Sequence, residues 1–312
     1  MNRYGFAAGA LAVVLLGLTQ APLDAQLPPE LRDYPLAQRH KTGDLVAPFF
    51  DGWYDNGDGS VTFVFGFMNR NLEEHVDIPL GSNNYIHPEE FNGVQPTHFP
   101  IYDRGGLTGA RERGAFGVTV PADMAGTEVW WTLTHAGRTY SVPGRATSPA
   151  YEMSRGAAAM GSLSPAIRFN RDGPESTDRE GIMANRVTAR VGVPVTLSAL
   201  VQDRGERMGY DTDAVVPVGT EWILHSGPVM PEFEPEMVTG RQRSDMMGDK
   251  GNGEGGLSSS RDGWTVATTQ ATFSEPGEYV IRLRADNFMA PDSKFDNQCC
   301  WSNAYVPVTV MP

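Results

Sequence analysis

The chain has 312 residues and a formal net charge of −13 at pH 7. A chain this acidic argues against nucleic acid or an anionic membrane surface as its partner, because both would repel it. Its 35 glycines and 23 prolines are spread along the sequence and leave few places for long helices. Short runs of β-branched and aromatic residues recur between turn residues, so we expect an all-β protein.

The N-terminus has the pattern of a signal peptide. Arg3 supplies a positive charge, the run Phe6–Leu18 is apolar, and small residues precede a cleavage site after Ala25. The apolar run of about 13 residues is shorter than the roughly 20 needed to cross a bilayer as a helix. We therefore expect residues 1–25 to be removed and the protein to be exported to the periplasm or outside the cell. A retained signal anchor is the alternative, and no later segment predicts a membrane span.

The remaining chain is long enough for two domains with separate cores. We predict two tandem antiparallel β-sandwich domains, over residues 26–145 and 165–312. A linker over residues 146–164 joins them, within a region whose composition turns to Pro, Ser, Gly and charged residues.

The N-terminal domain shows its strands through a two-residue alternation. The clearest run is Val61–Met68, where one face carries three phenylalanines that should lie in a core. Before it, Asp55–Ser60 contains Asn-Gly and Asp-Gly steps, which favour a tight hairpin turn. A calcium loop is the alternative, but Gly57 stands where such a loop needs an oxygen ligand. Trp130 and Trp131 are adjacent and must point to opposite faces, so one of them lies outside the main core.

The second half contains the segment Phe273–Tyr279, which reads Phe-Ser-Glu-Pro-Gly-Glu-Tyr and leads into an alternating strand. With Trp222 on an earlier strand, this segment resembles an immunoglobulin-like or polycystic-kidney-disease-type β-sandwich, over about residues 165–312. The resemblance implies that Tyr279 is the corner tyrosine before the sixth strand and that Trp222 is the buried tryptophan of the third strand. No family is recognised for the N-terminal domain.

The sixth strand of that sandwich alternates between two faces. Ile281 and the other apolar residues should be buried, whereas Arg282 and Arg284 should face solvent. Ile281 and Leu197 stand where antibody-type domains carry a disulfide, so apolar packing must replace that bridge. The segment after the third strand is expanded into a predicted long loop over residues 226–261.

The only cysteines, Cys299 and Cys300, are adjacent. In an exported protein they meet oxidising conditions, and the intramolecular choice is a vicinal disulfide. One hypothesis is a ligand-binding platform formed by Cys299, Cys300 and Trp301. The alternatives are a rigid clip that anchors the last strand, reduced buried thiols, a thiolate metal site or an intermolecular bridge.

Two loops carry groups that bind metal ions. Histidines and a carboxylate in the N-terminal domain could hold Zn²⁺ and leave a position open for water, although their spacing matches no compact motif. Carboxylates before the last strand are the oxygen ligands that Ca²⁺ prefers, although such groups also satisfy turn backbones. The candidate ligands are His87, Glu89 and His98 for zinc, and Asp286, Asp292 and Asp296 for calcium.

Searches for a nucleophile elbow, a reactive Cys with a partner His, and a His-Glu-x-x-His helix find no match in the sequence. We therefore predict a secreted or periplasmic, non-catalytic binding or assembly module for an extracellular or envelope ligand or protein. One alternative is a secreted metal-dependent or carbohydrate-active enzyme with its site at the His87 and His98 loop. Another is a structural subunit of an extracellular polymer that associates through strand edges.

Overall fold

The computed structural model describes residues 38–102, 111–153, 163–205, 218–235, 237–238, 263–286 and 300–312. These residues form strands and three short 3-10 turns, which confirms the all-β expectation. Within the described ranges, no helix has the length and apolar character needed to cross a membrane. The predicted signal peptide lies outside them. The 3-10 turns are η1 (Glu89–Phe91), η2 (Ala122–Met124) and η3 (Pro149–Tyr151).

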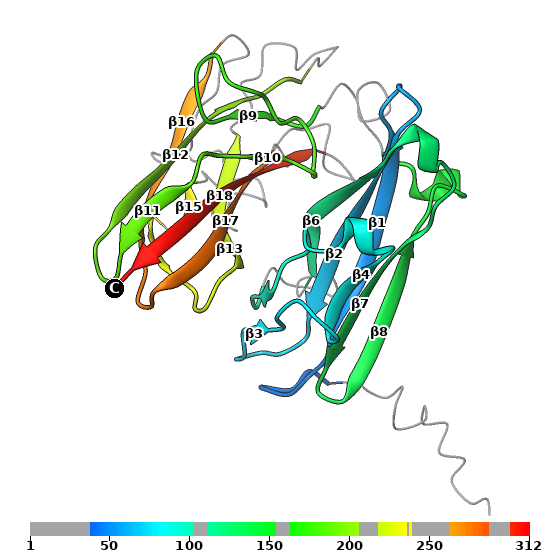
Figure 1. Cartoon of the computed structure of the whole chain (residues 1–312), viewed down its shortest axis with the longest axis horizontal. Coiled ribbons are helices and arrows are strands. Elements are labelled where there is room, and N and C mark those ends of the chain that lie inside the picture. Colours follow the sequence, from blue (N-terminus) through cyan, green and yellow to red (C-terminus); the bar gives the residue numbers. More distant parts are fainter. Residues whose placement is uncertain are drawn as a thin grey trace, which may run out of the picture. The chain divides into compact units, whose positions relative to one another are not determined.

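Strands β1 to β8 build a first sandwich (Figure 1). One sheet has the order β1-β2-β6, the other has the order β4-β7-β8, and β3 pairs with β5; all these pairings are antiparallel. The strands are β1 (Val46–Asp55), β2 (Val61–Asn69), β3 (Val76–Asp77), β4 (Asn84–His87), β5 (His98–Phe99), β6 (Arg111–Val120), β7 (Val129–His135) and β8 (Arg138–Gly144).

The core of the first sandwich is aromatic. The three phenylalanines of β2 are buried on one face, as the alternation predicted. Phe65 stacks on Phe116 with ring centroids 5.3 Å apart, and Phe116 meets Trp131 edge to face at 4.9 Å. Trp131 is fully buried and its neighbour Trp130 is 38% exposed, which confirms that the two indoles point to opposite faces.

The segment Asp55–Ser60 is the predicted hairpin turn between β1 and β2. The Asn56 amide donates to the Ser60 carbonyl at 3.1 Å, and Asp58 Oδ1 accepts from the Ser60 amide at 2.9 Å. The Asp58 carboxylate therefore serves the backbone of its own turn, as side chains of this type commonly do.

Strands β9 to β18 build a second sandwich. One sheet has the order β10-β18-β17-β13-β15, with β11 also on β18, and the other has the order β14-β16-β12-β9. The pairings are antiparallel except that β10 and β11 run parallel to β18. The strands are β9 (Ala166–Arg168), β10 (Ile182–Met183), β11 (Val187–Arg190), β12 (Val195–Gln202), β13 (Gly219–Ser226), β14 (Glu232–Glu234), β15 (Met237–Val238), β16 (Thr265–Thr272), β17 (Gly277–Asp286) and β18 (Trp301–Met311).

The core of the second sandwich contains the residues on which the resemblance rested. Trp222, Leu197 and Ile281 are all buried there, so apolar packing fills the place of the antibody-type disulfide. The Tyr279 hydroxyl donates to the Glu275 carbonyl at 2.9 Å, which is the contact expected of a corner tyrosine.

The predicted loop over residues 226–261 is wrong in its first part. Ser226 ends β13, Glu232–Glu234 pairs with β16, and Met237–Val238 pairs with β13. These short strands extend the two sheets because each finds an open strand edge beside it. Residues 239–262 lie outside the described ranges.

Part of the predicted linker over residues 146–164 packs against the first sandwich. The Met153 amide donates to the Trp53 carbonyl at 2.8 Å, and the Met153 side chain is buried. Residues 154–162 lie outside the described ranges. Arg39–Pro312 forms one compact unit that contains both cores.

Candidate functional site

Buried charges gather where β6 of the first sandwich meets β17 of the second. We call this set the arginine junction: Glu112, Glu221, Arg282, Arg284 and Asp286. All are buried except Glu221, whose side chain is 15% exposed. Charged side chains are almost never fully buried unless they are paired, so this cluster is the least expected feature of the chain.

A bulge in β6 positions the backbone groups through which the first sandwich contacts the second. The register between β2 and β6 shifts after Phe65, and Gly114 has φ +59°. A Cβ atom on Gly114 would overlap the Trp301 indole, so only glycine fits this close approach. The bulge turns backbone carbonyls of β6 toward the second sandwich.

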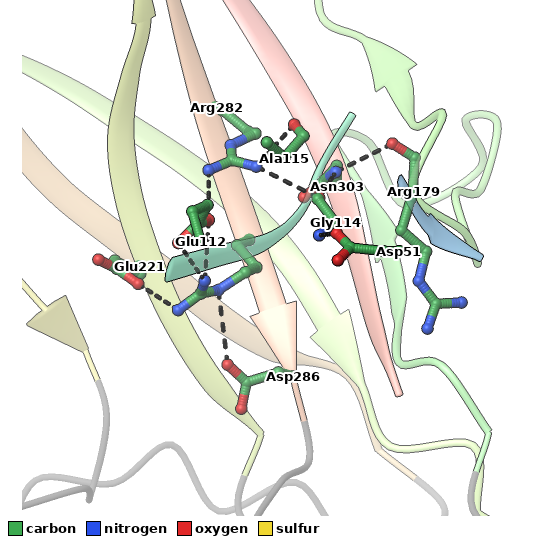
Figure 2. Close-up of polar contacts among 10 residues, drawn as sticks. Asp51, Glu112, Gly114, Ala115, Arg179, Glu221, Arg282, Asp286 and Asn303 are labelled. Atoms are coloured by element: carbon green, nitrogen blue, oxygen red, sulfur yellow. Dashed lines mark hydrogen bonds and ion pairs between the residues drawn. The ribbon is translucent and has the colours of Figure 1, made fainter. Parts of the chain in front are cut away.

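Arg282 makes the most direct contact across the junction (Figure 2). Its Nη1 donates to the Ala115 carbonyl at 2.6 Å, and its Nη2 donates to Glu112 Oε1 at 2.6 Å. The guanidinium thus has a charged acceptor and a backbone acceptor on its two terminal nitrogens, an arrangement for which the fork of arginine is suited.

Arg284 lies two residues further along β17, on the same face. Its Nη1 donates to both oxygens of Glu112, at 2.9 and 3.0 Å, and its Nη2 donates to Glu221. Glu221 stands directly opposite Arg284 on β13, and Asp286 Oδ2 is 3.7 Å from Arg284 Nε. Burial alone lowers the pKa of Arg284, but the surrounding carboxylates outweigh it and hold that pKa well above its usual value.

Asn303 on β18 continues the junction. Its Nδ2 donates to the carbonyls of Gly114 and Arg179, both at 2.9 Å (Figure 2). The Gly114 amide donates in turn to Asp51 Oδ2 at 2.7 Å. The bulge is therefore held through both its carbonyl and its amide.

His225 provides a further contact between the sandwiches. Its Nε2 lies 2.9 Å from the Val94 carbonyl, and its own carbonyl accepts from the Thr97 amide at 2.8 Å. Burial and, to a smaller extent, the positive charge of Arg282 together lower the pKa of His225 to about 3. The imidazole is neutral at pH 7 and donates from Nε2.

The predicted platform residues are placed differently from the hypothesis. Cys300 is buried and disulfide-bonded, and Cys299 lies outside the described ranges. Trp301 is 1% exposed, and the Arg179 guanidinium lies 4.3 Å from its ring centroid. Its indole packs in the interior between the sandwiches and does not offer a surface, because the β6 bulge covers it.

The predicted zinc ligands are not brought together. His87 and Glu89 are exposed, whereas His98 is buried with Nδ1 2.7 Å from Asp77 Oδ1. The His75 ring stacks on His98 with centroids 5.9 Å apart. Within the part of the chain that the structure describes, no group of three or more potential ligands could hold a metal ion.

Of the three predicted calcium ligands, Asp286 alone lies within the described residues. Asp286 is buried in the arginine junction, where it faces Arg284. Asp292 and Asp296 lie outside the described ranges.

A small cavity of about 140 Å³ is lined in part by Tyr54 and Met153, which pack with Trp301. Its wall carries Arg179, Arg204 and Asp178, together with hydroxyl and apolar groups. Cavities that hold drug-sized ligands usually measure about 300 to 1,000 Å³, so this one suits a few waters or a very small polar molecule.

The sequence alternation predicted that Arg282 and Arg284 face solvent, which is wrong. The sequence did not single out Glu112, Gly114 or Asn303. A cross-strand ion pair could have been predicted from the sequence, because two arginines share one face of a strand and Glu221 stands on the neighbouring strand. The sequence carried no signal that β6 would cover that pair.

No known protein family matches the sequence, and no curated protein matches it. Among solved structures, a PapD-like domain of human CEP192 is 9% identical, with a TM-score of 0.27, and covers 54% of this chain and 94% of its own. The D0-D1 domain of intimin is 9% identical, with a TM-score of 0.23, and covers 85% of this chain and 97% of its own. Domains 4 and 5 of the S-layer protein SbsC are 12% identical, with a TM-score of 0.20, and cover 86% of this chain and 98% of their own. Because these TM-scores are below 0.5, they carry no argument about activity.

Proposed function

We propose that this chain is an exported, non-catalytic binding or assembly module that acts in the periplasm or outside the cell. The observation that carries this proposal is the arginine junction. The acidic and histidine side chains that the fold gathers between the sandwiches each contact an arginine or a backbone group. Glu112 and His225 hold one sandwich against the other, and Glu221 and Asp286 fix Arg284 within the second sandwich.

The energetics of the junction support a module in which the two sandwiches keep a fixed position relative to each other. Interfaces between domains of one chain commonly permit motion. Here the contact is made by buried charge-assisted hydrogen bonds, and removing one partner of such a pair costs about 3 to 5 kcal/mol. Relative motion of the sandwiches would break these bonds, so we expect the junction to stay closed.

The N-terminal pattern supports export, and a first experiment tests it. The full chain is expressed with its own N-terminus in a Gram-negative host, and its mass and location are measured. We expect the mature protein to begin at Gln26 and to be found outside the cytoplasm. An uncleaved cytoplasmic product would contradict the proposal.

A second experiment tests binding with the mature protein. We expect it to co-sediment with purified cell-envelope fragments, and we expect Arg282→Met to weaken co-sedimentation while the protein remains folded by circular dichroism. Arg186→Met is the control, because Arg186 is an exposed arginine that pairs with Glu278. Equal binding by both variants would show that the junction is not needed.

The alternatives give different results with the same material. One tightly held zinc per chain, lost in His98→Ala, together with hydrolytic turnover would favour a metal-dependent enzyme. Concentration-dependent growth in light scattering without envelope fragments would favour a polymer subunit.

A further inference from the structure

The outer face of the β4-β7-β8 sheet carries two exposed aromatic rings. Tyr85 on β4 and Trp130 on β7 are each 38% exposed, while Ile86 and Trp131 beside them in sequence are buried. The alternation of the strands thus places both rings on the face that points away from the core.

The strand register places these two rings next to each other. Tyr85 stands opposite Thr132, and His87 stands opposite Trp130. Tyr85 and Trp130 are therefore diagonal neighbours on adjacent strands, a relation in which the residues lie about 7 to 8 Å apart or less and aromatic side chains can reach each other. Both stand on strands of a sheet, so their spacing is fixed before any ligand arrives.

Hydroxyl groups continue the same face. Thr132 Oγ1 lies 2.6 Å from Ser141 Oγ, and Thr134 Oγ1 lies 2.9 Å from Thr139 Oγ1. Each pair spans β7 and β8. Thr132 is buried, whereas Ser141 and Thr139 on β8 are exposed. A hydroxyl both donates and accepts, so the exposed β8 hydroxyls can exchange hydrogen bonds with a ligand that is itself rich in hydroxyl groups.

The carboxylate next to Trp130 is paired with an arginine. Glu128 Oε2 accepts from Trp130 Nε1 at 3.2 Å, and Glu128 Oε1 is 3.7 Å from Arg145 Nη1. The whole chain carries a formal charge of −13, so it repels anionic partners, nucleic acid included. A face with balanced charge in such a protein complements an uncharged ligand.

From these features we propose that the face made by Tyr85, Trp130 and the hydroxyl rows binds an uncharged polysaccharide. The faces of aromatic rings are electron-rich and attract the weakly positive C–H groups of a sugar ring, while the sugar hydroxyls reach Thr and Ser. Two neighbouring rings on one face of a sheet suit an extended polymer, which can contact both at once. This inference rests on the proposed binding function and names its ligand class.

Retention of the purified mature protein on insoluble cellulose, chitin and amylose tests the proposal. We expect at least one of the three to retain the protein, and Trp130→Ala or Tyr85→Ala to weaken retention roughly tenfold or more, as for a central aromatic contact. Tyr151→Ala is the matched control, because Tyr151 is an aromatic residue on η3 that is 50% exposed. Circular dichroism verifies that each variant is folded.

Several outcomes would overturn the inference. These are retention by none of the three polymers, or equal retention of Trp130→Ala and the parent protein. Stronger retention on anionic polygalacturonate than on the uncharged polymers would contradict the charge argument. A dimer in sedimentation equilibrium that Trp130→Ala dissociates would identify a second copy as the occupant instead. If envelope co-sedimentation persists while these polymer assays fail, only this inference falls and the proposed function stands.

Discussion

Replacing Glu112 by glutamine tests the arginine junction most directly. Glu112→Gln keeps the size of the side chain but removes the charge that faces Arg282 Nη2 at 2.6 Å and Arg284 Nη1 at 2.9 Å. Arg284 retains Glu221 and Asp286, whereas Arg282 retains the backbone carbonyls of Gly114 and Ala115. The loss therefore falls mainly on Arg282, whose side chain is 2% exposed.

We expect Glu112→Gln to lower the free energy of unfolding by about 3 to 5 kcal/mol, because it leaves a buried guanidinium without its carboxylate. Urea unfolding followed by tryptophan fluorescence measures this change. Glu278→Gln is the control: its pair with Arg186 has side chains 64% and 56% exposed, and exposed pairs contribute about 1 kcal/mol or less. A loss in Glu112→Gln no larger than that in Glu278→Gln would refute the reasoning.

A double-mutant cycle separates the pair energy from the cost of the glutamine itself. Arg282→Met removes the other charge and fills the space with an apolar side chain. If the two groups interact directly, the double variant should lose clearly less stability than the sum of the single losses. Strict additivity would mean that Arg282 and Glu112 do not stabilise each other.

Three further predictions concern single side chains. For His225, the folded-state pKa of about 3 lies below the unfolded value of 6.5. The neutral imidazole therefore adds its full contribution to the free energy of unfolding above pH 6.5, and this contribution is lost as the pH falls toward 3. The loss is about 2 kcal/mol between pH 6.5 and 5. His225→Gln should therefore lose less stability than the parent between pH 7 and pH 5 in urea unfolding, and an equal loss would contradict this origin. Tyr279→Phe removes the hydrogen bond to the Glu275 carbonyl and should cost about 1 kcal/mol in the same assay, whereas an unchanged free energy would show that the corner bond adds nothing. Gly114→Ala places a Cβ atom at a left-handed backbone position and against Trp301, so it should lower the free energy of unfolding by about 1 to 3 kcal/mol or more. It should also change the near-UV circular dichroism. A native spectrum with full stability would disprove the close approach.

The sequence by itself determined the clearest strands and the hairpin turn between β1 and β2. The phenylalanines of β2 were found by alternation, and the Asn-Gly and Asp-Gly steps of Asp55–Ser60 predicted the turn before them. The resemblance of the Phe273–Tyr279 segment to an immunoglobulin-like corner implied the role of Tyr279. The strand and the turn depend on residues a few positions apart, so local backbone chemistry and the two-residue period are sufficient to predict them.

Only the tertiary structure decided which sheet faces meet. Arg282 and Glu112 are 170 residues apart in sequence. The alternation along β17 predicts only that the side chains of Arg282 and Ile281 point to opposite faces of the sheet. Whether the face that carries Arg282 is exposed to solvent depends on whether another strand covers it, and here β6 covers it with its bulge at Gly114. The same reason explains why His98 contacts Asp77 instead of joining His87. A strand's pattern reveals its two faces, but what packs against the polar face is set by how distant strands fold together.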